Sequence, residues 1–281
     1  MPPAKPPLYI ASVRAKRLAR SLREHREQAR ITATKAAAHL GWSQGKVSHI
    51  ERCRNKPTQD DVARMLELYG VPTPERDALI ALAGEAERHG WWTEYVGVFN
   101  GPYVALEDEA SEICDWAPKV VPGLLQTQDY AREVISAGML NGDDDIERRL
   151  QARMARQTIL GRPNPPHLHV VLDEHVLERP LGGANVLRDQ LYKLRAEAAR
   201  PNVTIQVLPK SVGTHPGLDG AFIVLRFAED PDVGYVEGFH GAVYLESPPK
   251  VANCNVAWER LCRAALDPQE SAALIGAAAK Q

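Results

Sequence analysis

Long apolar runs and patterned cysteines are both absent from this chain of 281 residues. No stretch of about 18 consecutive apolar residues occurs, and a membrane-spanning helix needs at least that length. The proline-rich start has no apolar centre of the kind found in a signal peptide. The four cysteines show no CxxC spacing, which favours reduced thiols over a disulfide framework or a zinc site. We therefore expect a cytoplasmic chain with no membrane partner.

Patterns that mark common enzyme sites are scarce as well. No predicted strand leads into a serine elbow, and no glycine-rich phosphate loop follows one. His167 and His169 could place two metal ligands on one strand face, and Asp173 could add a carboxylate. No further ligand stands at a recognisable spacing from them. We expect no catalytic residue, no metal site and no cofactor.

What the chain does contain is a pair of helix signals between residues 31 and 51. Thr32 and Ser43 each precede a helical run, where a side-chain oxygen can cap the first backbone N–H groups. Gly41 can take the positive φ that ends the first helix. The buried side of the pair is predicted to consist of Ile31, Leu40, Val47 and Ile50. This pattern predicts two short helices joined by a glycine turn, the arrangement that presents a helix to the major groove of DNA.

The outward face of the second helix carries polar residues suited to DNA. A helix in the major groove reads base edges with its first residues, and glutamine can bind adenine through two hydrogen bonds. The predicted base contacts are Gln44, Lys46 and His49. The predicted phosphate contacts, which fix the register without reading sequence, are Thr32, Ser43, Ser48, Arg52, Arg54 and Lys56. The alternative is that these are ordinary solvated side chains on a surface helix.

Charge is distributed unevenly along the chain. The whole sequence has 34 basic and 36 acidic residues, but residues 1–70 hold 14 basic against 6 acidic residues, a net charge of +8. The remaining residues hold 20 basic against 30 acidic residues, a net charge of −10. A basic N-terminal part on an acidic remainder favours DNA contact at the N-terminal end alone.

Residues 20–70 resemble the phage-repressor-like helix-turn-helix family known as XRE. The resemblance rests on the string Ser-Gln-x-x-Val-Ser-x-Ile-Glu at residues 43–51 and on Pro57-Thr58, which opens the next helix. It implies an all-α DNA-binding domain of five helices. The family often has a glutamine directly after the first helix cap, and this chain has Ala33 there. The resemblance therefore implies no phosphate contact at that position.

The rest of the chain shows mixed helix and strand signals. Residues 103–116 are helix-like, and Thr127 can cap a helix that carries Tyr130, Ala131 and Val134. Later helices are predicted at 143–160, 183–199 and 249–266, with another after residue 268. Strand signals appear only after residue 166, at residues 167–172, 203–208, 221–227, 233–238 and 242–246. The first two strands could be parallel, and the last two predict a hairpin. We expect an α+β domain with a small mixed sheet.

These patterns divide the chain into three parts. Residues 1–12 are predicted to be a disordered tail, residues 13–88 the helix-turn-helix domain, and residues 89–281 a regulatory and dimerisation domain. In the last part, the apolar loop 120–127 could be buried core or a ligand wall. The loop 215–220 could be a plain turn or the edge of a pocket. Residues considered for a ligand or partner surface are Trp91, Trp92, Trp116, Leu124, Gln126, Tyr130, His215 and Asp219.

Residues 91–275 are similar to the C-terminal domain of WhiJ-type regulators. Three strings carry the similarity, at residues 121–127, 200–209 and 215–220. It implies an antitoxin-like transcriptional regulator of development or secondary metabolism, often encoded beside a small partner protein. The expected partners are a double-stranded DNA operator with two-fold symmetry and a second copy of the chain, in a homodimeric repressor. Two alternatives stay open: a module that captures a small partner protein, and a sensor of a small-molecule effector.

Overall fold

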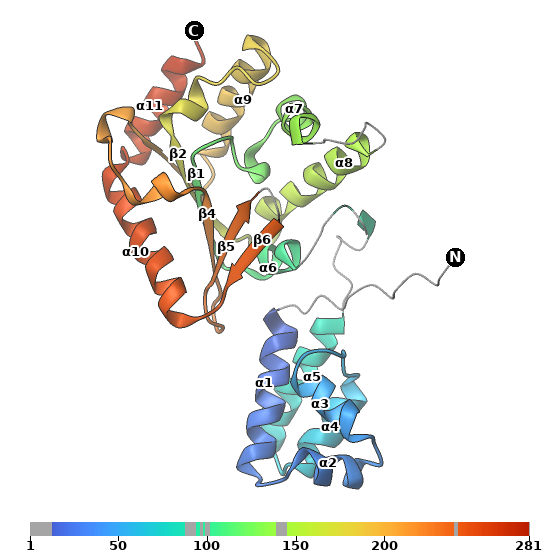
Figure 1. Ribbon diagram of the computed structural model, residues 1–281. Helices are drawn as coiled ribbons and strands as arrows, with labels where there is room; N and C mark the ends of the chain where they lie inside the picture. Colours follow the sequence, from blue (N-terminus) through green and yellow to red (C-terminus); the bar gives the residue numbers. More distant parts are fainter. Residues whose placement is uncertain are drawn as a thin grey trace. The chain divides into compact units, whose positions relative to one another are not determined.

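The computed structural model describes residues 13–87, 94–95, 98, 102–138, 145–238 and 241–280. The chain divides into two compact units, residues 1–109 and residues 110–281 (Figure 1). The tail predicted at residues 1–12 lies outside the described residues, as do Trp91 and Trp92. No helix in the described part of the chain is long and apolar enough to cross a bilayer.

The first unit opens with five helices around one apolar core, as expected. Their bounds are α1 Val13–Gln28, α2 Ala33–Leu40, α3 Gln44–Glu51, α4 Gln59–Leu68 and α5 Thr73–Glu87. A short helix, α6 Tyr103–Glu109, completes the described part of this unit. The buried side chains shared by the five helices include Leu18, Leu22, Ala36, Ala37, Leu40, Val47, Ile50, Val62, Met65 and Leu66. The predicted apolar set of α2 and α3 thus packs on the inner side of the bundle.

The second unit contains a mixed sheet with the strand order β3-β2-β1-β4-β5-β6 among the described residues. The strand bounds are β1 Glu112–Ala117, β2 His167–Asp173, β3 Val203–Leu208, β4 Phe222–Arg226, β5 Val233–Gly238 and β6 Gly241–Leu245. β1 and β3 both pair with β2 in parallel, whereas the β1–β4, β4–β5 and β5–β6 pairs are antiparallel. The expected α+β architecture, the parallel pair and the terminal hairpin are therefore confirmed.

The position of β1 corrects the sequence interpretation. Residues up to 116 were expected to be helical, with no strand before residue 166, but α6 ends at Glu109 and Glu112–Ala117 forms a strand in the middle of the sheet. Four of its six residues are buried, because the strand has neighbours on both sides and helices over the sheet. A strand buried on both faces loses the alternation of apolar and polar residues that identifies a half-exposed strand.

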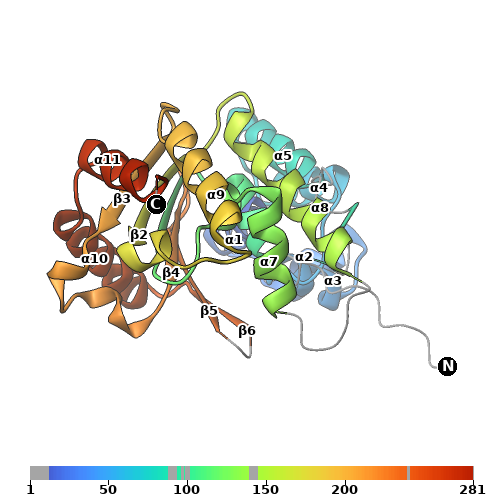
Figure 2. The same ribbon diagram turned by 90° about the horizontal axis from the view of Figure 1, so that it is seen from above.

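Helices cover both faces of this sheet. α10 Pro248–Ala264 contacts β3, β4 and β5, and its Trp258 and Leu261 pack against Cys114 and Trp116 of β1. Figure 2 shows α10 on one side of the sheet and α7 and α9 on the other. These helices span Gln128–Gly138 and Ala184–Glu197, while α8 spans Ile146–Arg156 and α11 spans Pro268–Ala278. α8 ends before the predicted residue 160, because the chain tightens into a 3-10 turn at Gln157–Gly161.

Candidate DNA-binding surface

The turn between α2 and α3 is built by local hydrogen bonds. Thr32 Oγ1 accepts from Lys35 N at 3.2 Å, and Ser43 Oγ accepts from Lys46 N at 3.2 Å. Gly41 ends α2 with φ of 70°, the left-handed conformation that glycine adopts without a Cβ penalty. Both predicted caps and the predicted glycine turn are therefore confirmed. Each capping hydroxyl uses a lone pair in its cap and keeps its O–H for another acceptor, such as a phosphate oxygen.

Residues 41–45 also read Gly-x-Ser-x-Gly, the residue pattern of a serine nucleophile elbow. That elbow joins a strand to a helix and holds the serine on a strained turn. Here the string joins two helices, and Ser43 has an extended backbone with φ of −73° and ψ of 147°. Its hydroxyl is the N-cap of α3.

α3 presents a divided surface. Val47 and Ile50 are buried in the bundle, with 0% and 2% of their surfaces exposed. Gln44 and His49 are exposed, and Ser48 is half-buried. The helix therefore offers its N-terminal glutamine and one histidine to a partner on the outer side.

A buried ion pair fixes the C-terminal end of α3 to α1. Arg26 Nε lies 2.7 Å from Glu51 Oε1, and Arg26 Nη2 donates to Glu51 Oε2 at 2.9 Å. Only 11% of the Arg26 side chain and 6% of the Glu51 side chain are exposed. Arg26 Nη1 also donates to Ile31 O at 2.9 Å, and the hydrogen bond to Glu51 raises the pKa of the guanidinium. No local sequence pattern indicates this pair, because its members are 25 residues apart.

Lys46 was predicted to contact a base, which requires a free ammonium group, but its ammonium group is bonded within the domain. Its Nζ lies 2.6 Å from Asp61 Oδ1 on α4 and 3.9 Å from the centre of the Trp42 ring. Burial alone raises the pKa of the Asp61 carboxyl, but the hydrogen bonds from Lys46 and from Thr58 outweigh it and lower that pKa. In this conformation Lys46 links α3 to α4, and a base contact would require it to leave Asp61.

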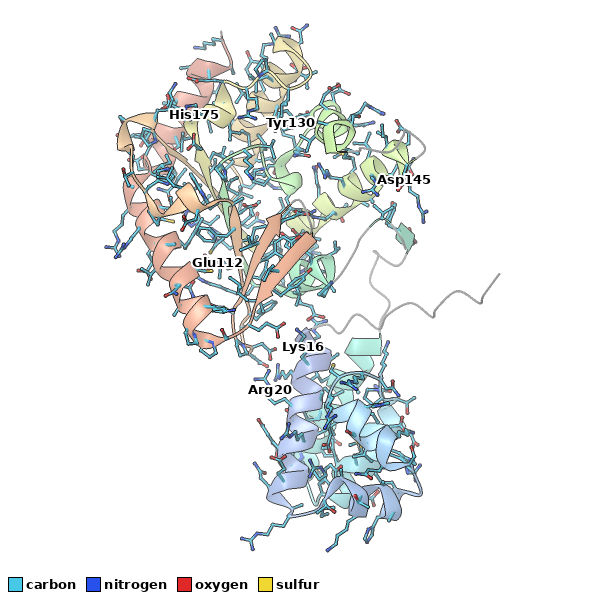
Figure 3. All side chains as sticks on the ribbon, viewed as in Figure 1. Lys16, Arg20, Glu112, Tyr130, Asp145 and His175 are labelled. Carbon is cyan, nitrogen blue, oxygen red and sulfur yellow. The ribbon has the colours of Figure 1, made fainter. Side chains whose placement is uncertain are left out.

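The predicted phosphate contacts lie around the ends of α2 and α3. Thr32 and Ser43 are exposed at the two helix starts. The basic residues that follow α3 are also exposed: Arg52, Arg54 and Lys56. Two cations of α1 lie elsewhere: Figure 3 shows Lys16 and Arg20 near the start of α1, at the end of that helix away from α2.

Most described candidates for a ligand or partner surface in the second unit are buried. Trp116 and Tyr130 are fully buried, and Leu124 and Gln126 are 3% and 1% exposed. These four side chains therefore form core and not surface, and the apolar loop 120–127 is also core. A 3-10 turn at Gly123–Leu125 folds this loop inward. The core interpretation of this loop thus replaces the ligand-wall alternative.

The loop 215–220 lies at the surface over Trp116. Trp116 Nε1 donates to Gly217 O at 3.0 Å, and the half-buried His215 ring meets the indole edge-on at 5.4 Å. Asp219 is exposed, and 66% of the Leu218 surface is open to solvent. The inner side of the loop therefore packs on the core, while Leu218 and Asp219 remain accessible.

His167 and His169 do not converge on a shared ligand. His169 Nε2 pairs with Gln206 Oε1 at 2.8 Å, and its ring lies edge-on to Trp258 with the centroids 4.9 Å apart. His167 Nε2 pairs with Thr204 Oγ1 at 3.2 Å. Among the described residues, no group of three or more histidine, cysteine, aspartate or glutamate side chains could hold a metal ion. Burial lowers the pKa of His169.

Comparison with known proteins matches both parts of the chain. Residues 17–79 match a family model described as a helix-turn-helix domain, and residues 101–277 match one described as a domain of unknown function, DUF5753. No curated protein and no solved structure matches the chain. The first match agrees with the cap and turn geometry of α2 and α3, so the N-terminal part is a helix-turn-helix DNA-binding domain.

Proposed function

Because the chain belongs to the DUF5753 family and carries a helix-turn-helix domain, we propose that it is a homodimeric, sequence-specific transcriptional repressor. The observation that carries the proposal is the presentation of α3. Its start is capped by Ser43, its end is held by the buried Arg26–Glu51 pair, and Gln44 and His49 remain exposed. A rigid helix with free polar residues on its outer side is suited to the major groove.

Within this proposal, Gln44 and His49 contact bases, and the exposed cations after α3 contact phosphates. Gln44 is the first residue of α3, and a glutamine there can bind the N6 and N7 edge of adenine. Arg52, Arg54 and Lys56 supply charge without reading sequence. Lys46 serves first as a structural link through Asp61. The net charge of +8 on residues 1–70, against −10 on the rest, confines DNA contact to the first unit.

Dimerisation supplies affinity that a single small domain lacks. Two domains place their reading helices one helical turn of DNA apart, about 34 Å, on an operator with two-fold symmetry. Bound in this way, the protein would block transcription from an overlapping promoter. The resemblance to XRE and WhiJ-type regulators supports this role, together with control of development or secondary metabolism. The proposal includes no catalytic step.

A second candidate role for the DUF5753 domain is capture of a small partner protein, in the manner of an antitoxin. The exposure of Leu218 favours it, because a large apolar side chain on a glycine- and proline-rich loop is a suitable anchor for a protein contact. If this role holds, Leu218→Asp removes a small protein that co-purifies from the native host. Tyr192→Asp, at a 47% exposed position on α9, is the matched control. Purification of the wild type without any partner counts against this role.

The DNA-binding proposal is tested with the full chain. Duplexes selected from a random library by the wild type are titrated in a fluorescence anisotropy assay at fixed salt. We expect Gln44→Ala to weaken binding about tenfold or more, because a two-point glutamine–adenine contact contributes about 1–3 kcal/mol. Gln151→Ala, which truncates an exposed glutamine on α8, leaves the affinity unchanged. Equal affinity for Gln44→Ala and the wild type excludes Gln44 as a reading residue.

The phosphate contacts have a separate test. Arg54→Ala should weaken binding to all sequences alike and reduce the slope of log K against log salt by about two for the homodimer, because each of its two Arg54 side chains accounts for about one released counterion. An unchanged slope contradicts a phosphate contact at Arg54.

A further inference from the structure

Two cations in the second unit converge on one buried glutamine. Gln126, which is 1% exposed, is held by its Nε2 donating to Val121 O at 2.7 Å. Its side-chain Oε1 accepts from Arg153 Nη1 of α8 at 2.8 Å, and its main-chain O accepts from Lys193 Nζ of α9 at 2.8 Å. A guanidinium and an ammonium on different helices thus share a single residue next to the Gly123–Leu125 turn.

Among the described residues, both cations donate hydrogen bonds to neutral oxygens only. The second acceptor of Lys193 Nζ is Gln157 Oε1, at 2.8 Å. Nearby carboxylates are engaged elsewhere, because Asp145 pairs with Arg149 and Glu197 pairs with Arg200. Glu237 of β5 is the acidic group that raises the pKa of Arg153, and it forms no ion pair with Arg153 in the described part of the chain.

Neutral amide oxygens replace only in part the hydration that these half-buried cations lose. The charges of Glu237 and Glu197 raise the pKa values of Arg153 and Lys193, but neither carboxylate forms an ion pair with its cation among the described residues. Burial, together with the charges of Arg156 and Arg149, lowers the pKa of Arg153 to about 10. Burial also lowers the pKa of Lys193. An arginine has five N–H donors in a planar fork that matches an oxyanion, and one of them is used by Gln126.

We propose that Arg153 and Lys193 form a binding site for the carboxylate or phosphate group of a small anionic ligand. The ligand supplies the missing negative charge and accepts the unused guanidinium donors, while Gln126 and Gln157 hold the two cations in place. Because α8, α9 and the Gly123–Leu125 turn meet there, the bound anion ties two helices of the unit together. Such a site would give the DUF5753 domain a ligand for its role as a small-molecule sensor. Anion binding itself does not depend on that role; only an effect of the anion on DNA binding does.

The test measures anion binding by the full chain without DNA, so its outcome is distinct from that of the DNA-binding proposal. Melting temperature is recorded in sodium phosphate, in sodium acetate and in sodium chloride of equal pH and ionic strength. We expect phosphate, acetate or both to raise the melting temperature of the wild type by about 3 °C over chloride, because a ligand that binds only the folded state stabilises it. The anion that acts identifies the ligand group as phosphate or carboxylate.

Variants connect this effect to the site. Arg153→Gln and Lys193→Gln lose the anion-specific rise, and Arg263→Gln, at a side chain 77% exposed on α10, retains it. If Arg153→Gln does not fold, the wild-type Arg153 side-chain Nε–Hε resonance is followed instead, and it shifts on phosphate addition while that of Arg263 does not. No rise in the wild type, an equal rise in the two site variants, or equal shifts of the two resonances overturns the proposal.

Discussion

Replacing Glu51 by glutamine tests whether the Arg26–Glu51 pair holds α3 in place. Both side chains are nearly inaccessible, at 11% and 6% exposure, and they share two short hydrogen bonds. Removing one partner of a buried pair costs about 3–5 kcal/mol, because the other charge is left without compensation. Glutamine keeps one acceptor oxygen, Ile31 O keeps its bond to Arg26, and Glu27 Oε1 stays 3.6 Å from Arg26 Nη2. We therefore expect the lower end of this range, about 3 kcal/mol.

Amide hydrogen exchange followed by mass spectrometry reads this loss in the full chain. A loss of about 3 kcal/mol corresponds to about 100-fold faster exchange, since each 1.4 kcal/mol is a factor of ten. The acceleration is expected in peptides from α1 and α3, while peptides from the sheet of the second unit keep the wild-type rate. Glu24→Gln is the matched control, because Glu24 is an exposed carboxylate on the same helix α1, where a surface substitution costs little.

Equal exchange rates in α3 for Glu51→Gln and Glu24→Gln would contradict a role of the ion pair in holding α3. That result would mean that the apolar residues of α3, Val47 and Ile50, hold the helix without the ion pair. An acceleration spread equally over both units would also contradict it, because the pair lies within the first unit alone.

Two further predictions concern the second unit. Burial lowers the pKa of His169 below its ordinary value of 6.5, so as the pH falls through 6.5 the unfolded chain binds a proton more readily than the folded chain does. The folded state should therefore become less stable as the pH is lowered from 7. Over this change the urea midpoint of His169→Gln should decrease less than that of the wild type, and equal decreases would contradict the lowered pKa of His169. A Cβ added at Gly217 would lie 2.4 Å from Trp116 Nε1, so Gly217→Ala should lower the melting temperature of the second unit. Gly138→Ala, where a Cβ meets nothing within 4 Å, should leave it unchanged, and equal melting of the two alanine variants would show that the loop yields to the indole.

The parts of the fold that could be predicted are those specified by neighbouring residues. Thr32 and Ser43 cap helices through bonds to residues three positions away, and Gly41 needs only its own backbone freedom. The sequence therefore contained the whole of the α2–α3 turn. The strand β1 depends on partners at residues 167–172 and 222–226, more than 50 residues further along the chain, and its doubly buried pattern gave no local signal.

The same distinction separates the site residues. Exposure of Gln44 and His49 followed from the helical spacing of Val47 and Ile50. The ion pair of Lys46 could not be predicted from that spacing, because its partner Asp61 lies on another helix. In the second unit, aromatic and apolar residue types are equally compatible with a pocket lining and with a core. Only the packing of the folded domain distinguishes the two. Packing placed Trp116, Leu124, Gln126 and Tyr130 in the core.

We propose that α3 reads DNA sequence, and a comparison of the sites selected by two proteins examines this role without an intermediate step. The full-length wild type and Gln44→Ala are each used to select duplexes from the same random library, and the bound pools are sequenced. We expect the wild type to select two inverted half-sites about 10 base pairs apart, and Gln44→Ala to lose the base preference at one position in each half-site. Identical base preferences in the two pools would contradict the account.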